Sequence, residues 1–319
     1  MCNLTDPIFH DEDAARAHLE ALRWADGVVC PLCGGTEKAK PLGGESMGPG
    51  WYHCGDCRKK FTVRVGTVYE RSKVPLHKWL LATQLMASSK KGVSAHQLHR
   101  TLAVTYKTAW FMAHRIREAM REDGPEGGLG GSAPVEADET YFGKVENPRT
   151  TRTDGRPFLK SGGGGANKRA VVALVERGGR VRTFHPERAT KNVVAAILFE
   201  NVRREATLYT DESRLYIAAG KQYATHESVK HSSHEYVRGD VHTNTVEDYF
   251  SIFKRGMKGI YQHCAEKHLH RYLAEYDFRY NHRTALGVND EERRDAILRN
   301  AEGKRLTYRR TASLHATAH

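Results

Sequence analysis

Four short segments in the second half of the chain combine apolar residues in patterns typical of β-strands. Residues 135–142 alternate apolar and polar side chains, 168–176 hold an apolar run, and 181–185 follow a Gly-Gly turn. The fourth segment, 206–210, comes after residues 191–203, which we expect to form a helix. These patterns predict three consecutive strands, a helix and a fourth strand. The residues that follow are predicted to be mostly helical.

Three helical stretches are predicted earlier in the chain. Pro75 can occupy the first turn of a helix over 76–86, Ser94 can cap a shorter helix, and Thr105 can cap a longer one that ends near residue 121. The last two helices resemble a helix-turn-helix, whose second helix would offer three cations to DNA: Lys107, Arg115 and Arg117. A helical bundle that carries these cations on a solvated face explains the same pattern.

Four of the six cysteines form two Cys-x-x-Cys pairs: Cys30, Cys33, Cys54 and Cys57. Two such turns can direct four thiolates at one tetrahedral Zn²⁺ ion, and a closed site of this kind is structural. A redox pair and a chance pattern are the alternatives, although a reducing cytosol disfavours paired disulfides. His53 could compete as a ligand, whereas Cys2 and Cys264 are expected to be ordinary thiols.

A glycine-rich stretch separates the two halves of the chain. Residues 122–132 contain five glycines and no periodicity, which is typical of a flexible linker. We therefore expect a helix and zinc ribbon (1–65), a helix-turn-helix-like module (66–121), a linker (122–134), an α/β catalytic domain (135–300) and a basic tail (301–319). The element order of the fourth part is that of a ribonuclease-H-like core, a mixed sheet with flanking helices.

The charge balance favours a nucleic acid as the partner. Lys and Arg number 50 against 38 Asp and Glu, which gives a formal net charge of +12. Such an excess suits a polyanion better than a small anionic metabolite. The first eleven residues contain neither a basic leader nor an apolar segment, and no stretch reaches the roughly 18 apolar residues that a membrane span needs. We expect a cytoplasmic protein without a membrane anchor.

Three carboxylates stand on separate predicted elements. Asp138 lies in the first strand, Asp211 follows the fourth, and Glu247, 36 positions later, opens a helical segment. Acids from separate elements can converge on two Mg²⁺ or Mn²⁺ ions, one of which activates a water or 3′-OH while the other holds the leaving oxygen. Lys254 comes two helical turns after Glu247, followed by Arg255, so a metal ligand and a phosphate-binding cation could follow one DNA backbone.

Neighbouring polar residues offer alternatives to this assignment. Asp211 could instead cap the helix that follows, and residues 244–247 fit a capping box in which Asn244 is the cap. Glu136 shares a strand face with Asp138 and is a substitute ligand, whereas Glu139 points to the other face and is expected to be solvated.

Two further polar stretches have ordinary explanations. The basic stretch 143–169 is either a mobile loop beside the acids or a simple disordered insertion. Three histidines have irregular spacing and are expected to be exposed to solvent: His226, His231 and His234.

The motifs, in their order along the chain, resemble those of bacterial insertion-sequence transposases that carry a zinc ribbon ahead of an ISXO2-like DDE domain. Besides the ribbon, the resemblance rests on Gly66-Thr-Val-Tyr69, Lys107-Thr-Ala-Trp-Phe-Met112, Ala137-Asp-Glu-Thr-Tyr141, Thr210-Asp-Glu-Ser213, His242-Thr-Asn-Thr-Val-Glu247 and Lys254-Arg255. It covers nearly the whole chain. It implies a metal-dependent enzyme that nicks transposon ends and joins the free 3′-OH to target DNA.

The resemblance also implies roles for individual residues. Asp138, Asp211 and Glu247 match the three acids, and Lys254 matches a DNA-contacting cation. Some groups of the family have asparagine in place of the last acid, which makes Asn244 a competing third ligand. Its amide oxygen can bind Mg²⁺ but supplies no charge, so Glu247 is the preferred ligand.

Two other function classes compete with a transposase. A DNA-binding regulator would use only the ribbon and the helix-turn-helix, and would leave the three acids unexplained. A ribonuclease-H-like hydrolase would use the same metals, with water rather than a 3′-OH as the nucleophile. If two DNA ends are processed together, we expect at least a homodimer on DNA.

Overall fold

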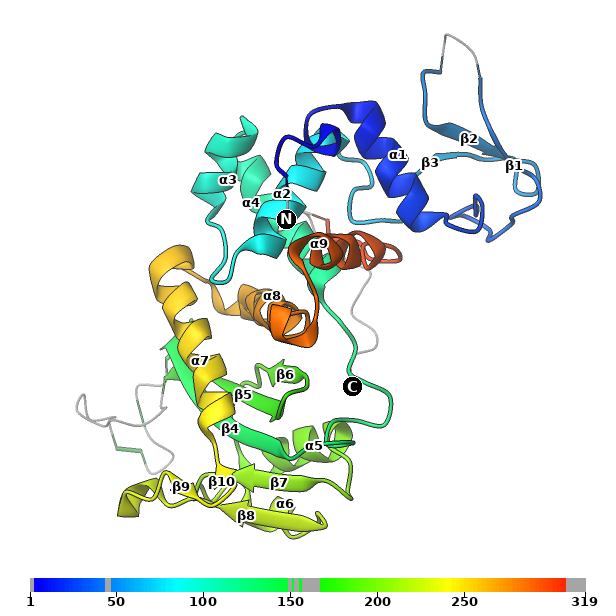
Figure 1. Cartoon of the computed structure of the whole chain (residues 1–319). Helices are drawn as coiled ribbons and strands as arrows, with labels where there is room; N and C mark the ends of the chain where they lie inside the picture. Colours follow the sequence, from blue (N-terminus) through cyan, green and yellow to red (C-terminus); the bar gives the residue numbers. More distant parts are fainter. Residues whose placement is uncertain (1–2, 44–46, 149–150, 152–154, 157–166, 308–319) are drawn as a thin grey trace. The chain divides into compact units, whose positions relative to one another are not determined.

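The computed structural model describes residues 3–43, 47–148, 151, 155–156 and 167–307. The chain divides into two compact units (Figure 1). The first combines Met1–Glu122 with Val288–His319, and the second is Asp123–Gly287. Cys2, most of the basic stretch 143–169 and the end of the basic tail lie outside the described residues. In the described part of the chain, no helix has the length and apolarity needed to cross a membrane.

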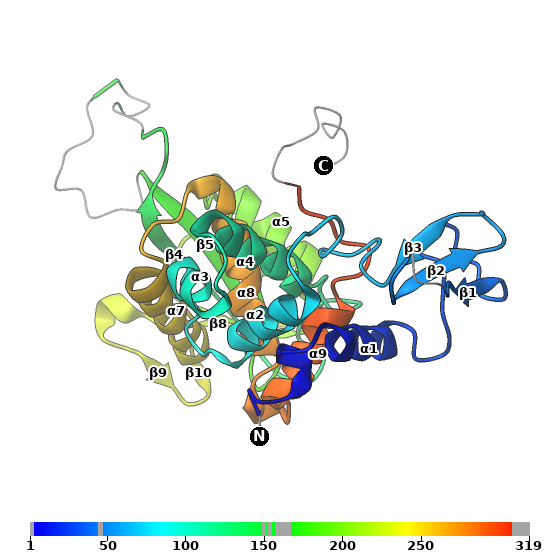
Figure 2. The ribbon, with the colours of Figure 1, turned by 90° about the horizontal axis from the view of Figure 1, so that it is seen from above.

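The first unit begins with a helix and a small antiparallel sheet (Figure 2). Helix α1 (Glu12–Arg23) precedes strands β1 (Ala39–Pro41), β2 (Trp51–Cys54) and β3 (Lys60–Thr62), which pair in chain order. The ring of Trp24 meets the rings of Tyr52 and Phe61 edge-on, with centroids 5.0 and 6.0 Å away. This aromatic contact covers one face of a sheet that is too small to bury a core of its own.

Three helices follow, close to their predicted positions: α2 (Leu76–Ser88), α3 (Ala95–Leu102) and α4 (Tyr106–Met120). The hydroxyl of Ser94 accepts the N–H of Gln97 at 3.1 Å, and that of Thr105 accepts the N–H of Thr108 at 3.2 Å. Both predicted caps are therefore confirmed. Between α3 and α4, Ala103 adopts a left-handed backbone with φ of 49°, which ends the first helix and lets the chain turn.

The final helix, α9 (Asp290–Arg299), belongs to the first unit. The second unit therefore ends at Gly287, whereas we expected the catalytic domain to extend to residue 300. The guanidinium of Arg293 donates to the carbonyl oxygen of Ala87 in α2 at 3.0 Å. Ile297 and Leu298 are buried. The boundary differs because α9 covers helices that lie about 200 residues earlier in the sequence, a pairing that local patterns do not encode.

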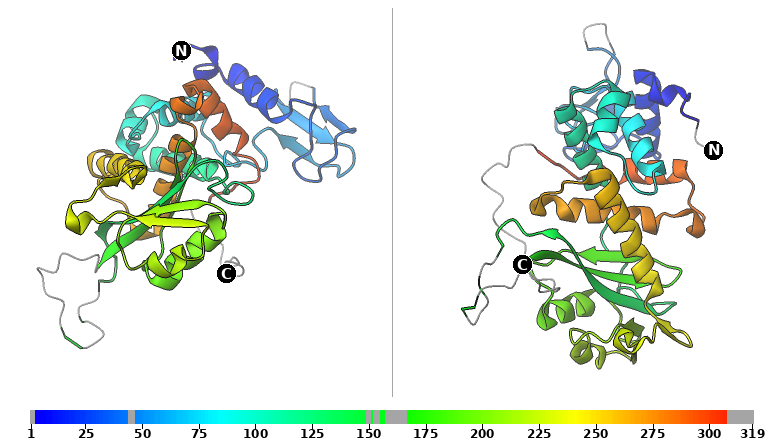
Figure 3. Two further views of the ribbon diagram at one scale, coloured as in Figure 1. Left: turned by 60° about the horizontal axis from the view of Figure 1, so that its bottom comes forward. Right: turned by 90° about the vertical axis from the view of Figure 1, so that its left-hand side faces the viewer.

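The second unit is built on a five-stranded mixed sheet in the order β6-β5-β4-β7-β8 (Figure 3). Its strands are β4 (Val135–Lys144), β5 (Lys168–Glu176), β6 (Val181–Phe184), β7 (Thr207–Thr210) and β8 (Thr225–Ser228). β4, β5 and β6 pair antiparallel, whereas β7 is parallel to both β4 and β8. The first four strands lie close to their predicted positions.

Helices cover both faces of this sheet. Val172 and Leu174 pack toward α5 (Lys191–Asn201) and the short α6 (Ile217–Gly220). Val171 and Val175 on the opposite face pack toward α7 (Asn244–Gly256) and α8 (Leu269–Asn281). Because both faces are buried, the interior strand β5 is a nearly continuous apolar run.

The expected linker is packed against the second unit. Leu129 is buried, its N–H donates to the carbonyl of Asn201 at 2.8 Å, and its own carbonyl accepts the N–H of Arg203 at 2.9 Å. Gly128 has φ of +86°, and a Cβ there would lie 2.9 Å from the carbonyl oxygen of Asn201. The glycines thus permit a close backbone approach, a role that composition does not distinguish from flexibility.

The region after β7 is less helical than predicted. Strand β8 forms an edge of the sheet, and β9 (Val237–Arg238) pairs with β10 (Val241–His242) in a separate hairpin. The sequence of β8 is Thr-His-Glu-Ser, which has the low apolar content of an exposed edge strand and gives no strand signal.

Asp277 of α8 connects this helix to the sheet and gives the second unit a pH-dependent stability. Its carboxylate accepts the N–H of Thr183 in β6 at 2.9 Å and the hydroxyl of Tyr249 in α7 at 2.6 Å. Burial raises the pKa of Asp277 to about 7. The folded chain therefore holds this proton more tightly than the unfolded chain. The resulting stabilisation is complete below the unfolded pKa near 4 and is lost as the pH rises through 7.

We predict that Asp277→Asn makes the unfolding free energy less dependent on pH. Between pH 4.5 and 7.5 the wild type should lose on the order of 2 to 4 kcal/mol more than the variant, because the amide does not titrate. Urea unfolding at several pH values measures this slope, with Asp248→Asn on the exposed side of α7 as the control. Identical slopes for wild type and Asp277→Asn would contradict the prediction.

Candidate metal centres and nucleic-acid interface

Two of the three predicted acids are brought together by parallel strands. Ala137 of β4 lies opposite Thr210 of β7, so the next residues lie side by side: Asp138 within β4 and Asp211 just after β7. Carboxylate oxygens of Asp138, Asp211 and Glu139 all lie within 4.8 Å of one another. Three hard oxygen donors at this spacing form a group that could hold a divalent cation.

The acids raise one another's pKa values. Burial, followed by the charges of Asp211 and Glu139, raises the pKa of Asp138 to about 8. Burial also raises the pKa values of Glu139 and Asp211. Burial and mutual repulsion therefore oppose the ionisation of these carboxyl groups, and a divalent cation would supply positive charge that favours it.

Glu139 was predicted to be solvated, and this prediction is wrong. It lies in the acid cluster, and the hydroxyl of Ser213 donates to its carboxylate at 3.4 Å. Strand alternation correctly places Glu139 on the other face from Asp138. However, at the end of β7 the chain turns under this face and brings Ser213 to it, which alternation does not reveal.

Glu136 was the substitute ligand, and the structure contradicts that role. Its carboxylate is fully buried and accepts the backbone N–H groups of Thr245 and Val246 at 2.8 and 3.0 Å. The guanidinium of Arg177 pairs with it at 2.6 Å. Glu136 therefore satisfies the first turn of α7 from outside the helix, and its oxygens are already engaged.

Because Glu136 performs this function, the predicted capping box does not form. Thr243 rather than Asn244 occupies the cap position, and the hydroxyl of Thr243 donates to Glu247 at 2.9 Å. Asn244 is the exposed first residue of α7.

Glu247 lies next to the acid cluster without joining the closest group of oxygens. Its negative charge contributes to the raised pKa values of Asp138 and Asp211. One carboxylate oxygen lies 3.8 Å from Nε2 of His231. The side chain is about half exposed (46%), so it is accessible to a ligand from solvent.

His231 is a residue of this site that the sequence analysis missed. The carboxylate of Glu212 accepts the N–H of Ser232 at 3.0 Å and its hydroxyl at 2.7 Å. These bonds fix the turn His231–Ser233 beside Asp211, whose pKa the charge of His231 lowers. His226 is also half-buried, with Nε2 at 3.0 Å from the hydroxyl of Thr210. Only His234 is exposed as predicted.

The two cations proposed on α7 lie beyond the acids on the same helix. The ammonium of Lys254 is 5.9 Å from the centre of the Phe250 ring, and Arg255 donates to the carbonyl of Ser251 at 3.2 Å. Lys254 is partly exposed and Arg255 is exposed, so both can be reached by a DNA backbone.

Two of the three cations predicted on the second helix of the first unit face inward. Arg117 is buried with 2% exposure. Arg115 donates to the carbonyl oxygens of Glu70 and Leu306 at 3.1 and 3.2 Å. These arginines hold the first unit together, so they are removed from the DNA-contact set, whereas Lys107 is exposed near the start of α4. A cation on an amphipathic helix can either face solvent or pair with buried carbonyl groups, and its residue type does not distinguish the two.

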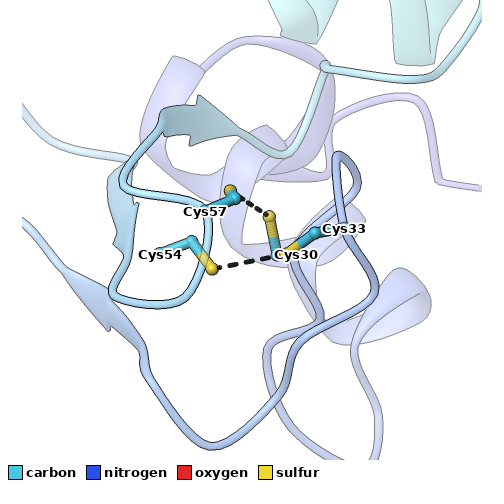
Figure 4. Close-up of side chains that lie close together, drawn as sticks. All are labelled: Cys30, Cys33, Cys54 and Cys57. Atoms are coloured by element: carbon cyan, nitrogen blue, oxygen red, sulfur yellow. Dashed lines mark hydrogen bonds between the residues drawn. The ribbon is translucent and has the colours of Figure 1, made fainter.

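The four predicted cysteines converge on one point (Figure 4). Sγ of Cys30 is 3.8 Å from Sγ of Cys57, and Sγ of Cys33 is 3.6 Å from Sγ of Cys54. A tetrahedral ion with Zn–S bonds of about 2.3 Å requires sulfur separations of about 3.8 Å. The cluster therefore fits a structural Zn²⁺. His53 is not a member of this group, and Cys264 lies in the second unit.

Comparison with known proteins matches both parts of the chain. Residues 10–60 match a transposase zinc-ribbon domain, and residues 128–281 match an ISXO2-like transposase domain. A relative from Halobacterium salinarum, described as an uncharacterized protein in transposable element ISH50, is 34% identical over 254 residues. The alignment covers 77% of this chain and 83% of the relative.

We predict that Cys54→Ser releases the zinc and unfolds the small sheet. Cys54 is buried and supplies one of four thiolates, and structural zinc sites contribute apparent binding energies of roughly 10 to 16 kcal/mol. Elemental analysis should show about one zinc per chain in the wild type and in the control Cys264→Ser, and almost none in Cys54→Ser. Limited proteolysis should then cut residues 25–63 and spare the second unit. If the purified wild-type protein contained no zinc, the prediction would be refuted.

We also predict that divalent-metal binding at the acid cluster strengthens as the pH rises. The pKa of Asp138 lies at about 8, so below that pH a cation must displace its proton, and affinity should rise about tenfold per pH unit. Calorimetric Mn²⁺ titrations between pH 6 and 8, in buffers of different ionisation enthalpy, measure both the affinity and the released proton. An affinity independent of pH over this range would contradict the prediction.

Proposed function

The chain belongs to the family of insertion-sequence transposases that carry a zinc ribbon ahead of an ISXO2-like transposase domain, and we propose that it cleaves the ends of its element and joins the freed 3′-OH to target DNA. The observation that carries this proposal is the convergence of Asp138 and Asp211 beside Glu247. Carboxylates from two strands and a helix are the donor set that two-metal phosphoryl transfer requires.

We further propose that the second unit has a ribonuclease-H-like fold. Three antiparallel strands are followed by a helix and then by two strands parallel to the first. This arrangement places Asp211, at the end of β7, beside Asp138 of the neighbouring strand β4, so the topology supports the same chemistry as the donor set.

The proposed site binds two Mg²⁺ or Mn²⁺ ions through Asp138, Asp211 and Glu247. When bound, the ions would activate the attacking water or 3′-OH and stabilise the leaving oxygen. Glu139 adds a fourth carboxylate at the cluster and can increase its negative charge. Glu247 is preferred over Asn244 as the third ligand because its charge already couples to both aspartates.

DNA binding is proposed for both units. In the first, α3 and α4 act as a helix-turn-helix, with Arg100 and Lys107 on their exposed side in place of Arg115 and Arg117. In the second, Lys254 and Arg255 contact the backbone of the strand that reaches the acids. Joining two element ends in one reaction requires at least two copies of the chain on DNA, and chromosomal DNA as the substrate places the protein in the cytoplasm.

A hydrolase that only nicks DNA is the second candidate function. It would use the same acids and differ only in the nucleophile. Supplying precut ends with a free 3′-OH and a supercoiled target plasmid separates the two, because only a transposase joins these ends to the plasmid.

We predict that Asp138→Ala, Asp211→Ala and Glu247→Ala each lower cleavage and joining by at least about 100-fold. Lost charge stabilisation of several kcal/mol corresponds to a loss of this size. Asn244→Ala and the control Asp248→Ala should keep most of the activity, and all five variants should still bind end DNA. Gel assays with labelled element ends measure cleavage, joining and binding.

The comparison of Glu247→Ala with Asn244→Ala identifies the third metal ligand. An active Glu247→Ala together with an inactive Asn244→Ala would reverse the assignment. Full activity in both would remove α7 from the metal site.

A further inference from the structure

An exposed aromatic side chain lies one ring away from the acid cluster. Tyr236 (55%) and Val237 (53%) are the two most exposed large hydrophobic side chains among the described residues. The ring of Tyr236 stands 5.2 Å from that of His231, at 50° between planes. Nε2 of His231 is in turn 3.8 Å from Glu247. His231 thus lies between Glu247 and the ring of Tyr236 and is in contact with both.

The segment that carries Tyr236 is fixed to the sheet at both ends. Val229 and Val241 pack with Tyr209 of β7 in a small core. Between them, Glu212 holds Ser232 through two hydrogen bonds. Tyr236 is therefore presented at a defined place beside His231, just before the hairpin of β9 and β10.

The surroundings of Tyr236 suit a nucleic acid. Lys230 and Arg238, which precede and follow it along the chain, are exposed. The guanidinium of Arg238 pairs with Glu227 and Glu235 at 3.3 and 3.5 Å, which holds it in place beside the hairpin. An exposed aromatic ring among cations is the combination on which unpaired nucleobases stack.

We propose that Tyr236, backed by the imidazole of His231, is a stacking site for the nucleobase next to the phosphodiester that the acids cleave. This proposal rests on the proposed function, since it names how the same site holds its DNA. Stacking would withdraw that base from the duplex, so that the backbone can bend toward the acids. Tyr236 would then be a substrate-positioning residue, with Val237 widening the apolar surface.

A fluorescent base in the DNA tests this directly. End DNA with 2-aminopurine on one or the other side of the cleaved phosphodiester is bound to protein carrying Asp138→Ala, so that the DNA is not cut. With Tyr236 or Tyr236→Phe, one of the two positions should show the same fluorescence change, and Tyr236→Ala should lose it. Tyr236→Ala should also weaken end binding by about 5- to 100-fold. Phe199→Ala, an exposed aromatic on α5, is the matched control and should behave as the parent.

The activity of the otherwise wild-type chain separates the two proposals. If that chain does not cleave end DNA with Mg²⁺ or Mn²⁺, the proposed function fails. Suppose instead that this chain cleaves, and that Tyr236→Ala changes neither its cleavage rate nor the fluorescence and affinity measured with Asp138→Ala. Only the stacking site is then overturned. A Tyr236→Ala variant that binds DNA normally but loses self-association in the absence of DNA would assign this surface to a second copy of the chain, which also overturns the stacking site.

Discussion

The buried carboxylate of Glu136 is the contact on which the geometry of the acid cluster depends. It lies two residues before Asp138 in β4 and binds the first N–H groups of α7, the helix that carries Glu247. Its partner Arg177 also donates to the carbonyls of Asp240 and His242 at 2.7 and 3.0 Å. One ion pair thus joins the central strand, the hairpin and the helix. Replacing a buried ion pair with apolar residues often costs little stability, so its main contribution here is position.

This arrangement explains how mutually repelling acids stay close together. Asp138 and Asp211 are held by paired strands and Glu247 by a helix whose start is bound to β4. These hydrogen bonds hold the backbone of each acid in place. The fold thereby keeps the carboxyl groups close together, and burial together with this proximity raises the pKa of Asp138. A rigid cluster of carboxyl groups favours small divalent cations over monovalent ones, since each divalent ion relieves twice the repulsion.

Sequence patterns predicted the parts of this fold that depend on local rules. The four main strands, the caps Ser94 and Thr105, the cysteine cluster and the meeting of Asp138 with Asp211 all follow from alternation, capping and spacing. The failures share a different cause. Glu136 is buried against α7, Glu139 joins the acid cluster and Arg115 turns inward, because their partners come from segments 40 to 190 residues away. Periodicity gives the face of a side chain and does not identify what covers that face.

The placement of α9 is the largest effect of this kind, and it orders the folding of the chain. The second unit is inserted between residues 122 and 288 of the first. Besides α9, the returning chain supplies Ala301, whose carbonyl accepts the N–H of Val68 at 3.2 Å, and Glu302, which pairs with Arg23 at 2.9 Å. During synthesis the second unit has all of its residues before the first does. Domains fold as units from the N-terminus onward, so the proposed catalytic core can form while α2 still lacks its cover. A fragment that ends near residue 125 would lack that cover, so the DNA binding proposed for the first unit should be tested with α9 present.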